Sequence, residues 1–176
     1  MPGTLLYREK DDKYKYIRDV FEMLIIKDIT NKYSIRNKEV IHDLAYFMMD
    51  NISSLTSANN ISKSLANANI KITDKTIKLY MQYLKDSYLF YKVRRYDIKG
   101  KKCLATNDKY YLSDHSFRYA IIGTKNMDYG RVYENIVAIE LLRRGYEVYV
   151  GKLYKKEVDF VAIKQNEKIY FQVSDD

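Results

Sequence analysis

The chain has 176 residues, 47% of them hydrophobic, and its 31 Lys and Arg against 23 Asp and Glu give a net charge of +8. That length can bury a sizeable core in one or two domains, whereas the single Cys103 excludes an internal disulfide and a cysteine-rich zinc site. No apolar run approaches the roughly 18 residues of a membrane span, and charged residues stand where a secretory signal would be apolar, so we expect a cytoplasmic protein without membrane contact.

The N-terminal region is predicted to be helical. From Lys13 to Tyr33, apolar residues recur with the spacing of one buried helical stripe, namely Ile17, Val20, Phe21, Leu24 and Ile25. Asn37 is a candidate N-cap for a second helix, which also carries His42. Because no Cys or second His lies near His42 in sequence, we interpret it as a surface residue and not as a metal ligand.

The next elements occur in the order of a winged helix. A short helix from Ser57 to Ala66 precedes a helix for which Thr73 is the expected N-cap. A strand from Tyr88 to Arg95, a turn at Lys99-Gly100 and a strand from Lys102 to Ala105 follow. Two helices and a hairpin in this order predict a recognition helix and a wing.

The net charge is concentrated in this part of the chain. Residues 57–113 contain twelve Lys or Arg and four Asp, a net of +8, so the remainder sums to zero. A basic segment on a neutral scaffold indicates a contact with a polyanion, although a solvated charged surface is the alternative. Tyr80 or Tyr83 could add base stacking. The expected nucleic-acid-binding residues are Lys75, Lys78, Lys85, Arg94, Arg95, Lys99, Lys101 and Lys102.

The C-terminal third is predicted to be a second domain. A strand at Lys109–Leu112 and a helix at Asp114–Ile122, with Asp114 as its expected N-cap, lead to a polar break. We place the boundary there, giving domains 1–122 and 123–176. A helix from Tyr129 to Arg143 ends before Gly145, and three strands follow, at 146–150, 157–163 and 168–173, the last two as a hairpin.

Strand alternation predicts which side chains of the hairpin lie together. It places Asp159 with Val161 and Ile163 on one face, with Val158 and Phe160 on the other. Gln172 and Ser174 likewise share a face.

A Glu-bearing helix, a strand with Asp159 and a strand ending Gln172-Val-Ser174 resemble the core of PD-(D/E)xK nucleases. That chemistry uses two acidic ligands for a divalent ion and a Lys beside the activated water. Here Gln172 replaces the acid and Ser174 replaces the Lys. The resemblance implies a vestigial site of Glu134, Asp159, Gln172 and Ser174, with Asp159 as a weak candidate metal ligand, weak Mg²⁺ binding at most, and Glu140 as the alternative to Glu134. The expected fold class is α+β, with N-terminal helices and a winged helix followed by a partial restriction-endonuclease-like sheet.

Six further stretches match a known pattern, namely 27–29, 57–61, 76–84, 109–114, 130–135 and 157–161. Together they resemble the C-terminal domain of unknown function of bacterial and archaeal AAA-type P-loop ATPases. No phosphate-binding loop of the form GxxxxGK[ST] occurs in the chain. The resemblance therefore implies no cofactor here, since ATP and its Mg²⁺ would belong to an upstream ATPase domain. The chain would be either an isolated C-terminal piece or a natural remnant, and the sheet would be incomplete at Asp176.

Three functions remain open from the sequence. The leading hypothesis is a nucleic-acid-binding or regulatory module of an ATPase, with a catalytically inactive nuclease-like site. The first alternative is a protein-interaction or oligomerisation module that binds the upstream ATPase domain or homologous protomers. The second is a metal-dependent nuclease with Glu134 or Glu140 and Asp159 as ligands. The missing Glu-x-Lys favours a protein that is not an enzyme, and the oligomeric state stays open.

Overall fold

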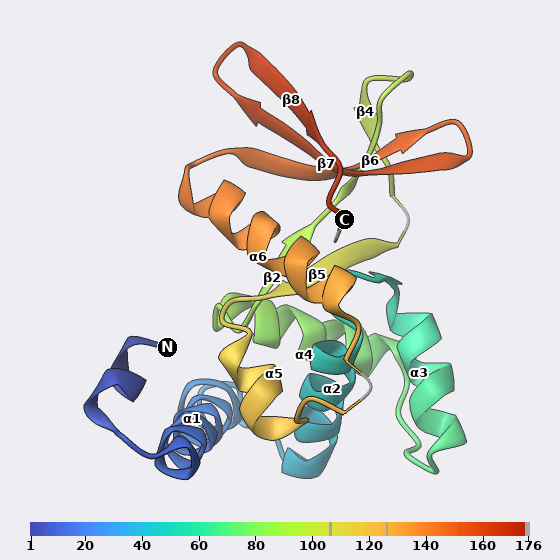
Figure 1. The fold of residues 1–176 in the computed structure, drawn as a ribbon. Helices are drawn as coiled ribbons and strands as arrows, with labels where there is room; N and C mark the ends of the chain where they lie inside the picture. Colours follow the sequence, from blue (N-terminus) through green and yellow to red (C-terminus); the bar gives the residue numbers. More distant parts are fainter. Residues whose placement is uncertain (106, 126, 175–176) are drawn as a thin grey trace. The chain divides into compact units, whose positions relative to one another are not determined.

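In the computed structural model, which describes residues 1–105, 107–125 and 127–174 apart from the side chain of Ile26, the chain is an α+β protein, as the sequence predicts (Figure 1). It divides into two compact units. The first comprises residues 1–51, 58–90 and 114–127, and the second comprises residues 52–57, 91–113 and 128–176. Both units are discontinuous in sequence, so they do not follow the expected domain boundary. The expected domains 1–122 and 123–176 stay a prediction.

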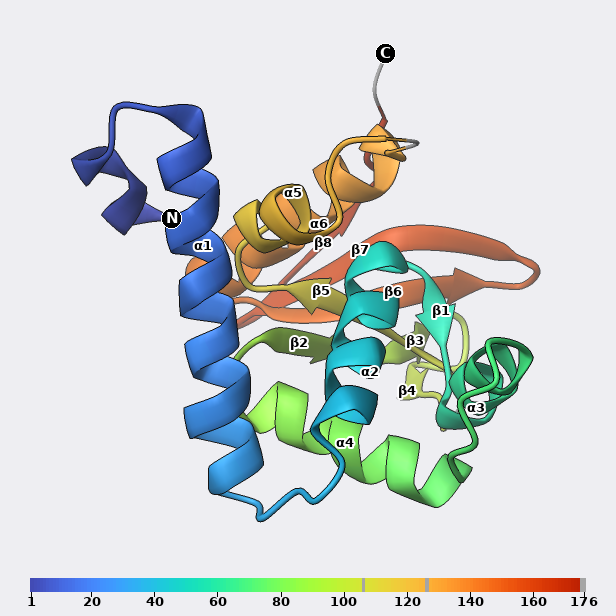
Figure 2. The same ribbon diagram turned by 90° about the horizontal axis from the view of Figure 1, so that it is seen from below.

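The first unit is built mainly from helices (Figure 2). The predicted N-caps Asn37 and Thr73 are confirmed, because their side chains accept the backbone N–H groups of Val40 at 3.3 Å and Thr76 at 3.2 Å. Asp114 lies one residue before the N-cap position, where it accepts the N–H of Ser116 at 2.9 Å. No helix of the described ranges combines the length and apolar character needed to cross a bilayer. The helices are η1 (Pro2–Leu6), α1 (Lys10–Met23), η2 (Leu24–Asn31), α2 (Lys38–Asp50), α3 (Ala58–Asn67), α4 (Asp74–Asp86) and α5 (Ser116–Ile121).

The long helix expected at 13–33 changes character at its middle. The α-helix α1 ends at Met23, and η2 continues it as a π-helix. Its buried residues Ile17, Phe21, Ile25 and Ile29 are spaced four apart, whereas an α-helix turns once every 3.6 residues. The wider π turn keeps this stripe on one side, and the Thr30 hydroxyl donates to the Ile25 carbonyl within that turn.

The second unit contains two sheets. The three-stranded sheet has the order β1-β5-β2, and the five-stranded sheet has the order β4-β3-β6-β7-β8. Strand β3 runs parallel to β6, and the other pairs of the five-stranded sheet are antiparallel. The strands are β1 (Leu55–Thr56), β2 (Phe90–Val93), β3 (Arg95–Asp97), β4 (Lys102–Cys103), β5 (Asp108–Leu112), β6 (Glu147–Leu153), β7 (Lys156–Lys164) and β8 (Glu167–Phe171).

The strand expected from Tyr88 to Arg95 is in fact two strands in different sheets. Strand β2 belongs to the three-stranded sheet, and β3 begins two residues later in the five-stranded sheet. The carbonyl of Arg94, between them, accepts the N–H of Val150 at 2.9 Å, which starts the pairing with β6. The predicted hairpin around Lys99-Gly100 is confirmed as β3–β4, with Tyr96 opposite Cys103.

The predicted alternation along β7 is wrong at Val158. The register between β6 and β7 shifts between Tyr149 and Gly151, so that Tyr149 lies opposite Val161 but Gly151 lies opposite Val158. This β-bulge brings Val158 to the same face as Val161, and a Cβ at Gly151 would lie 2.9 Å from atoms of both. The bulge leaves Asp159 and Phe160 together opposite Val150, so the predicted placement of Asp159 on the face of Val161 is also wrong.

Helix α6 (Tyr129–Arg143) covers one face of the five-stranded sheet. Its residues Ala138 and Leu141 share a buried cluster with Val148, Val150, Phe160 and Ala162 of β6 and β7. The predicted end of α6 at Gly145 is confirmed, since Gly145 has a φ of +78°, which glycine adopts without a steric penalty. Asn135 fixes α6 to β5, because its side chain accepts the N–H of Leu112 at 2.7 Å and donates to the Leu112 carbonyl at 2.9 Å.

Candidate functional site

The acid and amide expected from the nuclease resemblance lie together at the end of the β7–β8 hairpin. The Oδ2 atom of Asp159 accepts the side-chain amide of Gln172 at 2.8 Å and the backbone N–H of Val173 at 2.7 Å. Ser174 is exposed beyond the end of β8. Of the proposed site residues, Asp159 and Gln172 therefore make direct contact.

Glu134 of α6 belongs to a buried cluster that we did not predict from the sequence. The ammonium of Lys109, on β5, donates to Glu134 Oε1 at 2.9 Å and to Glu157 Oε1 at 2.6 Å. The hydroxyl of Tyr111 donates to the same Glu134 oxygen at 2.7 Å. The side chains of Lys109 and Glu134 are only 5% and 12% exposed, so one ammonium joins two carboxylates with little water around it.

Burial and charge shift the pKa values in this cluster. Burial raises the pKa of Glu134, and the opposing effects of Lys109 and Tyr111 do not cancel it. Burial acts to lower the pKa of Lys109, but the attraction of Glu134 and Glu157 outweighs it, so the pKa of Lys109 is raised. Burial, followed by the charge of Glu134, raises the pKa of Tyr111 well above its ordinary value. Lys109 is therefore held as a cation and Tyr111 as a neutral donor.

Hydrogen-bond donors occupy one oxygen of Glu134 and one oxygen of Asp159. Glu134 Oε1 accepts two hydrogen bonds, and Asp159 Oδ2 accepts two more. In the ranges 1–105, 107–125 and 127–174, no three Asp, Glu, His or Cys side chains are grouped so as to hold one metal ion. A Mg²⁺ ion, which is bound through carboxylate oxygens, would have to share this cluster with the ammonium of Lys109, which already lies between the Glu134 and Glu157 carboxylates.

Glu140, the alternative to Glu134, lies elsewhere on α6. Its exposed carboxylate accepts hydrogen bonds from Arg143 at 2.6 and 2.7 Å and from Arg144 at 2.7 Å, which lower its pKa to about 2. It is thus part of a surface ion pair.

The importance of Lys109 and Tyr111 could be inferred from one feature of the sequence. They alternate on a strand whose other positions include Tyr110 and Leu112, and all four are buried. A buried Lys requires an acidic partner, but the partners Glu134 and Glu157 come from other elements.

The candidate nucleic-acid-binding residues differ in their surroundings. Within the described residues, Lys78 of α4, Arg94 and Lys101 are exposed and form no ion pair. Lys85 is paired with Asp86 at 3.2 Å. Arg95 has a buried Nε that finds no hydrogen-bond partner among the residues that the structure describes. Lys75, Lys99 and Lys102 are also exposed.

The two tyrosines considered for base stacking lie against other rings. Tyr83 stacks on Tyr33 with 3.7 Å between ring centroids and an angle of 9°, and Tyr80 is 6.1 Å from Tyr83. One face of Tyr83 is therefore already covered by protein.

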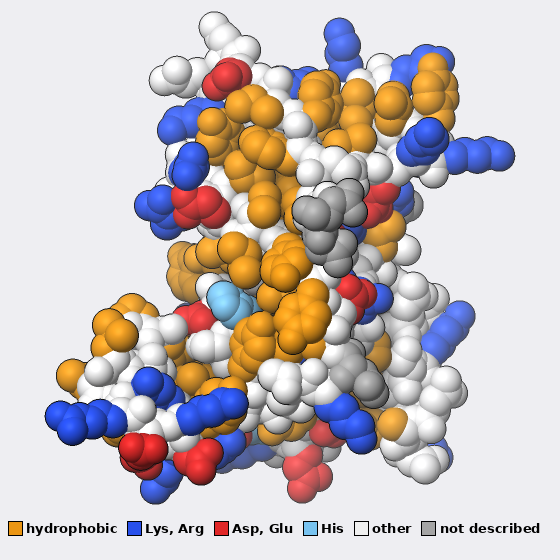
Figure 3. Space-filling model, in the orientation of Figure 1, with side chains coloured by type: hydrophobic (Ala, Val, Ile, Leu, Met, Phe, Trp, Pro, Cys, Tyr) orange, Lys and Arg blue, Asp and Glu red, His pale blue; other side chains and the backbone are white. Residues whose placement is uncertain are grey.

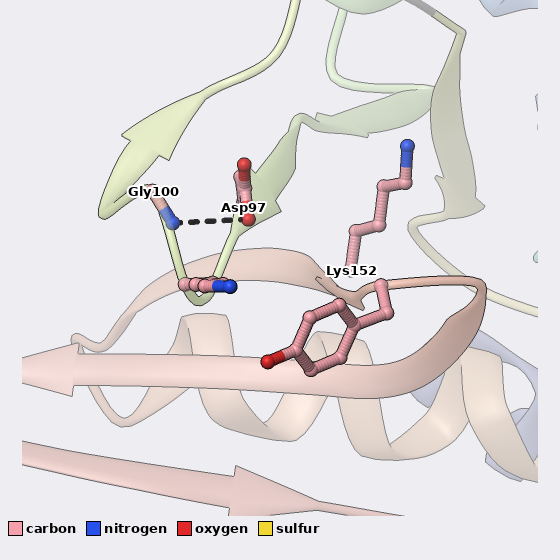
Figure 4. Close-up of a pocket in the computed structure, with 5 residues that line it drawn as sticks. Asp97, Gly100 and Lys152 are labelled. Atoms are coloured by element: carbon pink, nitrogen blue, oxygen red, sulfur yellow. Dashed lines mark hydrogen bonds between the residues drawn. The ribbon is translucent and has the colours of Figure 1, made fainter.

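The β3–β4 turn borders a basic pocket of about 460 Å³ (Figure 4). The N–H of Gly100 donates to Asp97 at 3.1 Å, which fixes the turn, while Lys99 and Lys152 line the pocket. The Lys99 ammonium lies 4.9 Å from the centre of the exposed Tyr154 ring. Lys and Arg side chains project from this end of the five-stranded sheet (Figure 3), so the pocket offers cations beside an aromatic ring.

Comparison with known proteins adds relatives but no activity. The family described as "Domain of unknown function (DUF8612)" matches residues 1–128. An uncharacterized protein of Haemophilus influenzae is 38% identical over 92% of this chain and 40% of its own length. An uncharacterized protein of Methanocaldococcus jannaschii is 27% identical over 96% of this chain and 38% of its own length. The chain thus spans about two fifths of these relatives, and no solved structure matches it.

Proposed function

The chain belongs to the family described as "Domain of unknown function (DUF8612)", and we propose that it is a nucleic-acid-binding or regulatory module of a larger P-loop ATPase. The observation that carries the proposal is the basic segment 57–113, with its net charge of +8. Lys78, Arg94 and Lys101 in this segment are exposed and, within the described residues, unpaired. Such side chains are available to phosphates, which dominate the affinity of proteins for nucleic acids.

The order of the elements supports a winged helix as the basis of this binding. Helix α2 is followed by β1, α3, α4, β2, the β3–β4 hairpin and β5. The sheet order β1-β5-β2 brings the last strand between the other two, with the hairpin inserted before it. On this basis α4, which carries Lys75 and Lys78, is the recognition helix, and the β3–β4 turn is the wing.

The buried cluster supports a nuclease-like site that has lost catalysis. Lys109 pairs with Glu134 and Glu157, and Asp159 accepts hydrogen bonds from Gln172 and Val173. Ser174 stands where the nuclease motif has a Lys, so this position supplies no ammonium to stabilise developing charge. We therefore propose binding without cleavage.

Charge reversal at Lys78, Arg94 and Lys101 tests the proposal. Fluorescence anisotropy of a labelled duplex, recorded over a range of salt concentrations, should show weak binding with little sequence preference. If each residue contacts one phosphate, the triple variant should bind more weakly and its salt slope should fall by about one per contact.

A control triple reversal of Lys15, Lys27 and Lys38 changes the net charge equally in the neutral part of the chain, at exposed positions. Equal effects of both triples would mean that net charge alone determines binding. Unchanged affinity in the first triple would refute the proposed phosphate contacts and favour the protein-interaction alternative.

A further inference from the structure

The five-stranded sheet has one face that α6 does not cover. Val148, Val150, Phe160 and Ala162 point to the α6 side, where they join Ala138 and Leu141 in the core. Because strand side chains alternate, Tyr149 and Val161 point to the opposite face. In the described part of the second unit α6 is the only helix, so no helix of that unit packs on this opposite face.

Three tyrosines lie on this opposite face. Tyr149, Val161 and Tyr170 are register partners across β6, β7 and β8. Tyr149 and Tyr170 are two strand spacings apart, a distance of about 10 Å. Val161 lies between them on the sheet and is fully buried. Tyr96 of β3 pairs with Gly151, on the same side as Tyr149, and its ring centre lies 5.5 Å from that of Tyr149. The result is two neighbouring rings and a third, half-exposed ring beyond a small apolar gap.

Cations accompany these rings. The Lys168 ammonium lies 5.0 Å from the centre of the Tyr96 ring and donates to its hydroxyl at 3.2 Å. The positive charge of Arg94 acts on the Tyr149 phenol and so opposes the rise in the pKa of Tyr149 that burial causes. Aromatic rings beside Lys and Arg are the combination by which proteins hold unpaired bases and their phosphates.

We propose that this tyrosine face, formed by Tyr96, Tyr149, Val161 and Tyr170 with Arg94 and Lys168, binds single-stranded nucleic acid by base stacking. The inference rests on the proposed nucleic-acid function and adds a chemically distinct mode of contact, base stacking, which shares Arg94 with the proposed duplex contacts. Bases stack on Tyr96, Tyr149 and Tyr170, while Arg94 and Lys168 neutralise the adjoining phosphates. Because stacking uses the faces of the bases, the site takes all four bases.

A set of three labelled probes separates stacking from charge. The full chain is titrated with an oligothymidylate of about 15 nucleotides, within the site sizes common for such surfaces, with an abasic strand of equal length, and with a duplex. Stacking predicts that the abasic strand binds about tenfold or more weakly than the oligothymidylate, since it keeps the phosphates and loses the bases. Equal binding of the two single strands would overturn the proposal.

Substitution of Tyr170 gives an independent test on the protein side. Tyr170→Leu keeps a strand-compatible apolar side chain and should weaken oligothymidylate binding about tenfold, the effect of one lost stacking contact. Tyr170→Phe should restore the wild-type affinity. The matched control is Tyr129→Leu, because Tyr129 on α6 is 51% exposed against 50% for Tyr170. Equal effects of the two Leu variants, or none at Tyr170, would contradict the proposal.

The duplex distinguishes this inference from the proposed function. If Tyr170→Leu leaves duplex binding intact and weakens single-strand binding, the result supports both the proposed function and the tyrosine face. Duplex binding with no dependence of single-strand binding on bases or on Tyr170 refutes the tyrosine face alone. If the chain binds none of the three probes, the proposed function fails and the inference fails with it.

Discussion

The buried ammonium of Lys109 gives the sharpest prediction about stability. Lys109→Met keeps an unbranched side chain of similar length and removes the charge between Glu134 and Glu157. Breaking a buried ion pair by removing one partner costs about 3–5 kcal/mol. Since Glu157 is 33% exposed and can regain water, whereas Glu134 is 12% exposed and cannot do so fully, we expect a loss of about 3 kcal/mol, at the low end of that range.

The assay is urea unfolding at neutral pH, with Lys92→Met as the control. Lys92 pairs with Asp108 at 2.8 Å, but its side chain is 37% exposed, so its loss should cost only about 0–1 kcal/mol. The two variants make the same chemical change on neighbouring strands and differ chiefly in burial. In thermal unfolding, a loss of about 3 kcal/mol corresponds to about 6–12 °C for a chain of this size.

The pH dependence identifies the carboxylate responsible. Burial already raises the pKa of Glu134, and removal of Lys109 takes away a charge that lowers it. A carboxyl whose pKa is raised in the folded state destabilises that state when ionised, so stability recovers as pH falls through the folded pKa. The deficit of Lys109→Met should therefore shrink on acidification, beginning above the ordinary Glu pKa of about 4.3.

The variant should also acquire a response to divalent ions. Without the ammonium, Glu134 and Glu157 retain uncompensated charge, so millimolar Mn²⁺ should stabilise Lys109→Met more than the wild type. A deficit no larger than that of Lys92→Met, independent of pH, would refute the view that Lys109 is the cation compensating these carboxylates.

Two further predictions concern the scaffold. Asn135→Leu removes the side chain that bonds the N–H and the carbonyl of Leu112. It should lower the free energy of unfolding by about 1–3 kcal/mol for each group. A loss below about 1 kcal/mol in urea unfolding would contradict this. Gly151→Ala puts a Cβ 2.9 Å from atoms of Val158 and Val161, so it should destabilise by about 1–3 kcal/mol, whereas Gly130→Ala near the start of α6 should be neutral or stabilising; thermal unfolding of both variants checks the difference.

Local features of the sequence predicted the helices and the hairpins. The caps at Asn37 and Thr73 and the glycine after α6 depend on residues only a few positions apart. The β3–β4 and β7–β8 hairpins likewise follow from a turn between two strand patterns. The alternation rule failed at Val158, because the bulge depends on how β7 pairs with β6, and no residue in β7 itself indicates it.

The candidate site was predictable only in part. The nuclease resemblance drew attention to Glu134, Asp159 and Gln172, and the contact between Asp159 and Gln172 agrees with their expected convergence. It did not identify Lys109, because the salt bridges join β5 to α6 and β7 over long separations in sequence. A buried charge and its partners are recognised together only when the strands and the helix are assembled.

The central claim, binding without cleavage, can be tested in one sample. A labelled duplex is titrated with the wild-type protein in buffer containing Mg²⁺ or Mn²⁺, its anisotropy is followed, and the same sample is then run on a denaturing gel. The account predicts a salt-sensitive rise in anisotropy and a DNA strand of unchanged length. Strand cleavage that depends on the divalent ion and disappears in Asp159→Ala, or the absence of any binding at low salt, would contradict it.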